Sequence, residues 1–237
     1  MRTLVIIPAF NEARAIGRVI SDIPAGLVDE VVVVNNASTD ETEANARAAG
    51  ATVLTELQRG YGFACLRGIA YAKTQQPEVV VFLDGDYSDH PDEMDRLLAP
   101  ILRGEADFVL GSRMRGPREA GAMLPQAILG NWLACSLMRW IWGARYTDLG
   151  PFRAIRFADL LALDMQDTTF GWTIEMQIKA VLAGLRYREV PVSYRKRVGV
   201  SKITGTVTGT LKASYKILWT IAKFALRLGT TPKAVPS

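Results

Sequence analysis

Short apolar runs alternate with helical patterns along the first half of the chain. Runs rich in β-branched residues are typical of buried strands, and apolar positions at helical spacing follow each run. The predicted strands are 3–8, 30–34, 52–55, the apolar part of 79–86, and 107–110. The predicted helices are 11–23, 41–49, 63–73 and 92–102. Repeated strand–helix units of this length predict an α/β fold with an open, mostly parallel sheet covered by helices.

The pattern changes after residue 113. A Gly-, Arg- and Pro-containing stretch at 114–122 predicts a mobile loop of the kind that closes over substrate. The later predicted elements are an apolar helix at 124–142, a tight polar turn at 148–153, a helix at 171–183, an alternating strand at 187–194 and a basic loop at 195–202. Without internal repeats or a low-complexity linker, we expect one main domain, 1–205, and a C-terminal appendage, 206–237.

The appendage carries an amphipathic pattern over 211–228. At about 100° per residue, its basic residues fall within about 60° of one another on a helix. These are Lys212, Lys216, Lys223 and Arg227. The opposite side holds Leu218, Ile221, Phe224, Ala225 and Leu228, with Tyr215 and Trp219 at one flank. A helix lying in a membrane interface has this pattern, and so does a helix packed on its own domain with its lysines in water. The apolar arc is wider than one docking surface on a domain usually requires, which favours the interpretation of 211–228 as a helix in the membrane interface.

Composition narrows the classes of protein. The chain has 237 residues, a formal charge of +4, two cysteines and one histidine. Cys65 and Cys135 have no metal or redox spacing, so free thiols in a reducing cytoplasm are expected. The single histidine, His90, excludes His-rich zinc sites and fits a helix start before Pro91. No signal peptide and no apolar run of transmembrane length is present. The basic residues gather near the C-terminus without a nucleic-acid-binding module, which disfavours nucleic acid as a partner.

The candidate chemistry lies at the end of the central strand. Asp84-Gly85-Asp86 follows five apolar residues, so it is expected at the carboxyl end of a buried strand, where open α/β sheets bind ligands. Two carboxylates together with substrate phosphates are a typical environment for Mg²⁺. A plain surface turn has the same composition. The turn after the first strand has no glycine triplet, which disfavours a dinucleotide-binding oxidoreductase.

Several stretches in register resemble one known family. They are 5–12 (VIIPAFNE), 35–40 (NNASTD), 84–86 (DGD), 111–113 (GSR), 148–153 (DLGPFR) and 195–202 (RKRVGVSK). Their order and spacing resemble family 2 glycosyltransferases of the GT-A fold, a three-layer α/β/α sandwich. Within that family the chain looks most like the dolichyl- or polyprenyl-phosphate glycosyltransferases, such as dolichol-phosphate mannosyltransferases. The resemblance spans about residues 3–205.

This resemblance implies a nucleotide-sugar donor and inversion at the anomeric carbon. By matching position, Pro8, Phe10 and Glu12 would line the nucleotide pocket, and Asn36 would lie beside the base. The family usually has an aspartate at the position of Asn36. An amide can donate as well as accept, so UDP-glucose and GDP-mannose types of donor both stay open.

The resemblance also implies a divalent cation, Mg²⁺ or Mn²⁺. Asp86 would ligate it, and Asp84 would contact the ion or the ribose. Gly85 separates the two carboxylates. The third family ligand lies two residues further on, which is Ser88 here, and a hydroxyl is a weaker ligand.

The implied acceptor is a lipid phosphate, which is ionised near neutral pH and needs no base. Arg113, Arg197 and Lys202 would bring the two anions together. Asp148 could orient the acceptor or an arginine, act as base for a hydroxyl acceptor, or only cap its turn. Glu175 resembles the acid that other family members use as base, or only pairs with an arginine.

Several alternatives stay open. The same donor chemistry could serve a soluble hydroxyl acceptor. A non-enzymatic membrane-binding module is a further alternative, whereas a D-x-D phosphohydrolase is disfavoured because three strand–helix units precede the motif. Family members anchored in membranes carry transmembrane helices after the catalytic domain. This chain shows only 211–228 there, so we expect a peripheral protein at the inner face of the membrane. The sequence does not specify the oligomeric state, so a homo-oligomer also stays open.

Overall fold

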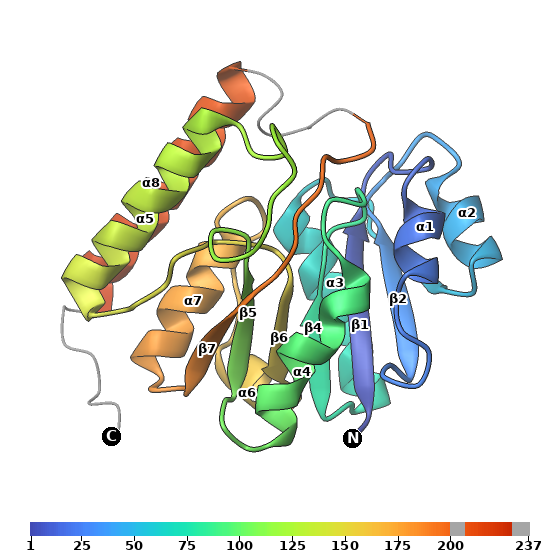
Figure 1. Ribbon diagram of the computed structural model, residues 1–237, viewed down its shortest axis with the longest axis horizontal. Helices are drawn as coiled ribbons and strands as arrows, with labels where there is room; N and C mark the ends of the chain where they lie inside the picture. Colours follow the sequence, from blue (N-terminus) through green and yellow to red (C-terminus); the bar gives the residue numbers. More distant parts are fainter. Residues whose placement is uncertain (200–206, 229–237) are drawn as a thin grey trace.

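The computed structural model describes residues 1–199 and 207–228, with side chains described except at 207–213 and 227–228 (Figure 1). One seven-stranded sheet has the order β3-β2-β1-β4-β6-β5-β7. Its strands are β1 Thr3–Ala9, β2 Glu30–Asn35, β3 Thr52–Thr55, β4 Val79–Phe82, β5 Phe108–Ser112, β6 Arg153–Arg156 and β7 Tyr187–Pro191. All strand pairs are parallel except those that β6 makes with β4 and β5. The predicted α/β fold with a mostly parallel sheet is confirmed.

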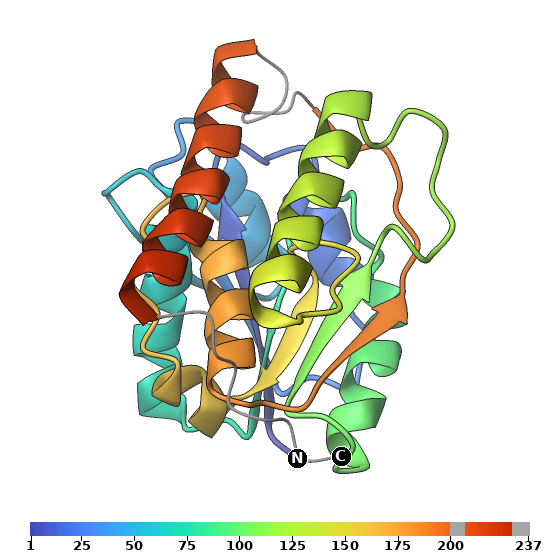
Figure 2. The same ribbon diagram turned by 90° about the vertical axis from the view of Figure 1, so that its left-hand side faces the viewer.

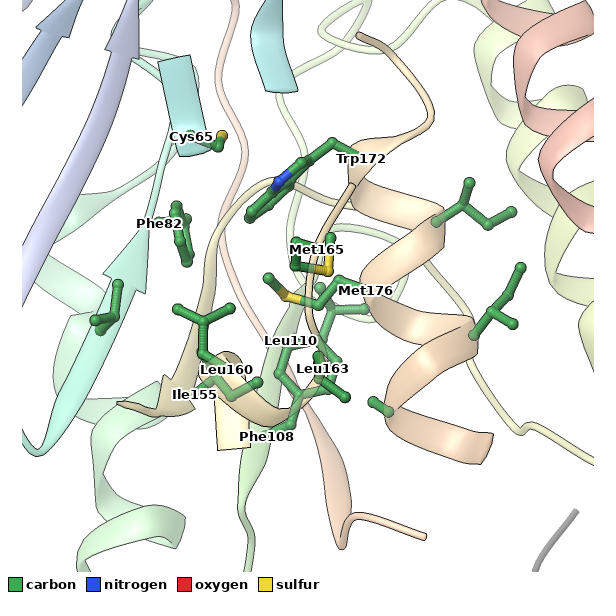
Figure 3. Close-up of a cluster of buried hydrophobic side chains, with 14 of the residues drawn as sticks. Cys65, Phe82, Phe108, Leu110, Ile155, Leu160, Leu163, Met165, Trp172 and Met176 are labelled. Atoms are coloured by element: carbon green, nitrogen blue, oxygen red, sulfur yellow. The ribbon is translucent and has the colours of Figure 1, made fainter. Parts of the chain in front are cut away.

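Helices cover both faces of this sheet. They are α1 Ile16–Ser21, α2 Thr42–Ala48, α3 Tyr61–Gln75, α4 Met94–Leu102 after a 3₁₀ turn at Pro91–Glu93, α5 Pro125–Trp142, α6 Phe157–Ala162, α7 Trp172–Leu182 and α8 Val207–Leu228. Residues of α1, α2 and α4 share one hydrophobic core with the sheet, and residues of α3 and α5–α8 share the other. In the second core, Trp172 packs edge-on against Phe82 with ring centroids 4.7 Å apart (Figure 3).

The parallel strands point their carboxyl ends towards the upper edge of the sheet in Figure 1. At this edge β4 ends at Phe82, and α1 begins only at Ile16. The predicted helix at 11–23 is therefore too long, because residues before Ile16 form a turn. In that turn the carbonyl of Glu12 accepts the N–H groups of Ala15 and Ile16. This shortening leaves loop residues beside the end of the central strand.

The antiparallel strand β6 and the short helix α6 were not predicted. The sequence at 153–156 is RAIR, in which arginines flank only two apolar residues. Arg153 is nevertheless fully buried and donates to the carbonyls of Leu149, Gly150 and Thr173. Burial lowers the pKa of Arg153 to about 10. The predicted polar turn thus leads directly into the middle of the sheet.

The C-terminal helix α8 lies against α5 and α7, as Figures 1 and 2 show. Its residues Ile221 and Phe224 are buried in the second core, and Lys216 pairs with Asp167 at 2.8 Å. Within the described ranges, no helix combines the length and the apolar character needed to cross a bilayer. The predicted domain boundary at 205/206 falls in 200–206, outside the described residues.

Candidate active site

The D-G-D motif lies directly after β4, in a loop whose own side chains fix its shape. The backbone N–H of Ser88 donates to Asp86 Oδ1 at 2.9 Å, and the Ser88 hydroxyl donates to the same oxygen. The N–H of Asp84 donates to Asp89 Oδ2 at 3.3 Å. Gly85 lies between Ile7 and Ile16, whose side chains leave only contact distance for a Cβ. The loop is therefore held in place against β1 and α1.

Asp86 is also bound by the basic loop that follows β7. Arg197 Nη2 lies 2.6 Å from Asp86 Oδ2, and the N–H of Val198 donates to the Asp86 carbonyl at 2.9 Å. Burial alone would lower the pKa of Arg197, but the charges of Asp86 and Asp84 raise it. A guanidinium ion thus neutralises the carboxylate that the sequence assigned to a metal ion.

Two further carboxylate oxygens at this site have no hydrogen-bond partner among the described residues. They are Asp84 Oδ1 and Asp89 Oδ1. Burial, and then the neighbouring carboxylates, raise the pKa of both groups. Orphaned buried oxygens need a cation, a proton or water. The part of the chain that the structure describes contains no cluster of three or more acidic, His or Cys side chains arranged to hold an ion alone. This donor set fits a cation that takes its other ligands from substrate phosphates and water.

Arg113 and Asp148 form a buried ion pair beside this loop. The guanidinium binds both carboxylate oxygens, at 2.8 and 2.7 Å, and the N–H of Arg113 donates to the same carboxylate at 2.7 Å. Asp148 is fully buried and also accepts the N–H of Leu149. Burial would lower the pKa of Arg113, but the charge of Asp148 raises it well above its usual range. Asp148 therefore orients an arginine.

Glu175 is buried in α7, where its carboxylate organises a neighbouring loop. It accepts the backbone N–H groups of Gln166 and Asp167 at 2.6 to 3.2 Å and pairs with Lys179 at 2.8 Å. All of these partners belong to α7 and to the loop that precedes it. These contacts hold the loop before α7 against the helix, and the cation that pairs with Glu175 is a lysine, not the arginine that the sequence suggested. Of the predicted cations, Lys202 falls outside the described residues.

The predicted nucleotide-pocket residues lie on β1 and in the loops that follow β1 and β2. Pro8 is buried within β1, and the ring of Phe10 stacks under the guanidinium of Arg59 at 4.6 Å. Asn36 donates to the carbonyls of Glu56 and Gln58 and accepts the N–H of Gly60 at 2.8 Å. Its amide is thus engaged in holding loop 56–60. The backbone N–H of Glu12 donates to the hydroxyl of Thr42.

Sequence reasoning missed two features of this edge. Asp89 has the same chemistry as Asp84 and lies five residues after it, so its spacing could have been noticed. Tyr87 adopts a positive φ of 67°, and its ring lies 3.3 Å from the guanidinium of Arg195. Arg195 also donates to the carbonyls of Tyr87 and Asp89. The stack anchors the first residue of the basic loop, and no sequence pattern indicates it.

The predicted mobile loop at 114–122 is tied down at its centre. The N–H of Glu119 donates to the carbonyl of Tyr194 at 2.8 Å, and the N–H of Tyr194 donates to the carbonyl of Pro117 at 3.0 Å. Gly116 permits this approach, because a Cβ there would lie 1.9 Å from the carbonyl oxygen of Val192. Loop 114–122 and the start of the basic loop therefore form one hydrogen-bonded unit.

Open α/β sheets bind their ligands at the carboxyl ends of the strands, and at this edge the protein carries paired carboxylates and arginines. The family model "Glycosyl transferase family 2" matches residues 4–160. The chain belongs to this family and is a glycosyltransferase with the GT-A fold. This confirms the resemblance at the level of the family.

Sequence similarity to two relatives extends over most of the chain. An uncharacterized glycosyltransferase of Mycobacterium tuberculosis is 34% identical over 217 residues, which cover 88% of this chain and 93% of the relative. The undecaprenyl-phosphate mannosyltransferase of Micrococcus luteus is 30% identical over 225 residues, covering 88% and 90%. A crystal structure of glucosyl-3-phosphoglycerate synthase from M. tuberculosis, with Mn²⁺, UDP-glucose and phosphoglyceric acid, superposes with a TM-score of 0.74 at 24% identity. It covers 94% of this chain and 79% of that one, and it shows the fold alone.

Proposed function

We propose that this glycosyltransferase moves a hexose from a nucleotide sugar, of the UDP-glucose or GDP-mannose type, to a polyprenyl or dolichyl phosphate, with inversion. The observation that carries the proposal is that both candidate base carboxylates have internal partners. Asp148 is bound by Arg113, and Glu175 by Lys179 and two backbone N–H groups. A hydroxyl acceptor needs a base, whereas a phosphate monoester is already ionised near neutral pH.

The donor pyrophosphate would bind at the carboxyl end of β4. Asp84 and Asp86 would hold Mg²⁺ or Mn²⁺ there, and Ser88 would keep Asp86 oriented through its hydrogen bonds. The ion, when bound, would stabilise the charge that develops on the leaving nucleoside diphosphate. The orphaned oxygens of Asp84 and Asp89 support this assignment. Pro8, Phe10, Glu12 and Asn36 remain the proposed wall of the nucleotide pocket.

The acceptor phosphate would be held by arginines. Arg113 is fixed by Asp148 and reaches the ring of Tyr194, with its guanidinium 5.1 Å from the ring centroid. Arg197, 29% exposed, would move from Asp86 to a phosphate once a divalent ion occupies that carboxylate. Lys202 would follow in the same basic loop. The full-length similarity to an undecaprenyl-phosphate mannosyltransferase supports a lipid phosphate acceptor.

A soluble acceptor is the second candidate. A glucosyl-3-phosphoglycerate synthase, crystallised with phosphoglyceric acid, shares the fold over 94% of this chain. This supports a small soluble acceptor as the alternative. Such an acceptor reacts through a hydroxyl group. It would therefore require one of the engaged carboxylates to be released.

To test the proposal, the protein is incubated with Mn²⁺, a labelled nucleotide sugar of each type, and either a polyprenyl phosphate or 3-phosphoglycerate. Label is expected in the organic phase with the lipid phosphate. Asp86→Asn should lower transfer by at least about a hundredfold, because the charge on the leaving group loses its stabilisation. Asp95→Asn, on the exposed side of α4, is the matched control and should transfer normally. Label found only on the water-soluble acceptor would support the second candidate, and no transfer to either would contradict the proposal.

A further inference from the structure

Two neighbouring helices expose the same apolar pattern. On α5 the exposed large side chains include Leu129, Trp132, Leu133 and Trp140, at 63, 61, 39 and 83%. On α8 they are Tyr215, Leu218, Trp219 and Leu226, at 69, 40, 54 and 85%. In each set the later members follow the first by 3, 4 and 11 residues, which places all four on one helix face. We call these two rows of side chains the apolar platform.

Both rows face away from the body of the protein. On α5 the buried positions, among them Ala134 and Met138, lie on the side opposite Trp140. On α8 the buried Ile221 and Phe224 lie on the side opposite Leu226. The two helices lie side by side along their length, and Figure 2 views both from outside. The wide apolar arc of α8 is thus divided, because one part packs on the domain and the other remains exposed.

The charges of these helices point to one kind of occupant. Neither α5 nor α8 contains an Asp or Glu, although the chain has 24. Arg139 on α5 and Lys223 on α8 are exposed next to the apolar rows. A second copy of the same surface would bring like charges together, whereas an anionic lipid surface complements them. Tryptophan and tyrosine side chains favour the level of the lipid headgroups.

We infer that the apolar platform docks the protein flat on a bilayer that contains anionic lipids, with α5 and α8 both at the interface. This inference rests on the proposed function, in which the acceptor is a lipid phosphate. It also extends the predicted contact from 211–228 to a second helix that is distant in sequence.

The experiment measures binding of the full chain to vesicles of phosphatidylcholine with and without phosphatidylglycerol. The double variant Trp140→Ser/Trp219→Ser should weaken binding by about tenfold or more, because two aromatic side chains no longer enter the interface. Leu102→Ser, 58% exposed at the end of α4, is the matched control and should bind as the parent does. Arg139→Gln/Lys223→Gln should lose about tenfold or more of the preference for anionic vesicles. Its control, Arg67→Gln/Lys73→Gln on α3, should keep that preference.

Two results would overturn the inference. One is equal vesicle binding by the parent and the tryptophan variant. The other is a parent that forms dimers in sedimentation velocity and does not bind vesicles, with the tryptophan variant monomeric, since the platform would then bind a second copy. Transfer to a short-chain, water-soluble polyprenyl phosphate is measured in parallel. It reports the proposed function without a membrane, so failure of docking and failure of the acceptor assignment are distinguishable.

Discussion

Asp86 is the residue at which two cations compete. Arg197 binds Asp86 Oδ2 at 2.6 Å, and the proposed divalent ion needs the same carboxylate. A charge-assisted hydrogen bond contributes about 1.5–3 kcal/mol, so its removal should favour the ion. We expect Arg197→Gln to bind Mn²⁺ about tenfold more tightly in the absence of nucleotide. Electron paramagnetic resonance of free Mn²⁺ measures this directly.

The same substitution should slow sugar transfer, because the proposed acceptor phosphate loses a guanidinium. Arg197→Lys is the informative control, since it keeps the charge but not the two-pronged geometry. It should bind Mn²⁺ nearly as the parent does. Unchanged or weaker Mn²⁺ binding by Arg197→Gln would show that the guanidinium and the metal do not share Asp86.

The residues of the site show what sequence reasoning can and cannot reach. The position of Asp84 and Asp86 follows from the apolar run before them, because a buried parallel strand has to end at the ligand-binding edge. The contacts of Asn36 and Glu175 do not follow from any pattern. Both hold backbone groups of loops, and such partners are determined only when the loops pack. Roles inferred from a matching position therefore stay proposals.

At the scale of elements, the start of α3 depends on a glycine. A Cβ on Gly62 would lie 2.0 Å from the carbonyl oxygen of Asp167 and 2.6 Å from the carbonyl carbon of Thr168, both in the loop before α7. Backbone atoms cannot move aside as a flexible side chain does. Gly62→Ala should therefore destabilise the protein by about 1–3 kcal/mol, despite the better helix propensity of alanine. Urea unfolding followed by circular dichroism provides the measurement.

Gly17 in α1 is the matched control for Gly62. An added Cβ there meets nothing within 4 Å, so Gly17→Ala should stabilise the protein by about 0.5–1 kcal/mol. Opposite signs for the two substitutions are the expected result. If Gly62→Ala were as stable as the parent, the close approach of the α6–α7 loop to α3 would be incorrect.

Whether a strand could be predicted depended on how clear its hydrophobic pattern is. Strands β1 to β4 were predicted because parallel strands covered on both faces need continuous apolar runs. Strand β6 escaped prediction because arginines flank its two apolar residues, and the first of them, Arg153, is buried. Its place between β4 and β5 is determined by tertiary packing and not by its local sequence. The face of α8 that meets the domain was also not specified, since its apolar arc is wide enough for two surfaces.

At the scale of the whole molecule, the core holds neutral groups that alkaline solution would ionise in the unfolded chain. Burial raises the pKa of Cys135 to about 12 and raises that of Tyr146 well above its usual value. Cys65 and Tyr61 shift in the same direction for the same reason. Above the ordinary values of 9.0 and 10.0, the unfolded chain loses these protons and the folded chain keeps them. The favourable contribution is therefore complete below about pH 9 and decreases as the pH rises.

Arg153 acts in the opposite sense, but only above about pH 10, where its lowered pKa lies. We therefore expect the free energy of unfolding to fall as the pH rises above about 9. Each group that stays neutral in the folded chain steepens this fall by up to about 1.4 kcal/mol per pH unit once it titrates in the unfolded chain. Tyr146→Phe should make this fall shallower, because the ring remains while the titrating hydroxyl, which has no partner among the described residues, is removed. Tyr215→Phe, at a site 69% exposed, is the control and should follow the parent. Identical pH dependence in all three proteins would mean that Tyr146 does not stay neutral in the folded core.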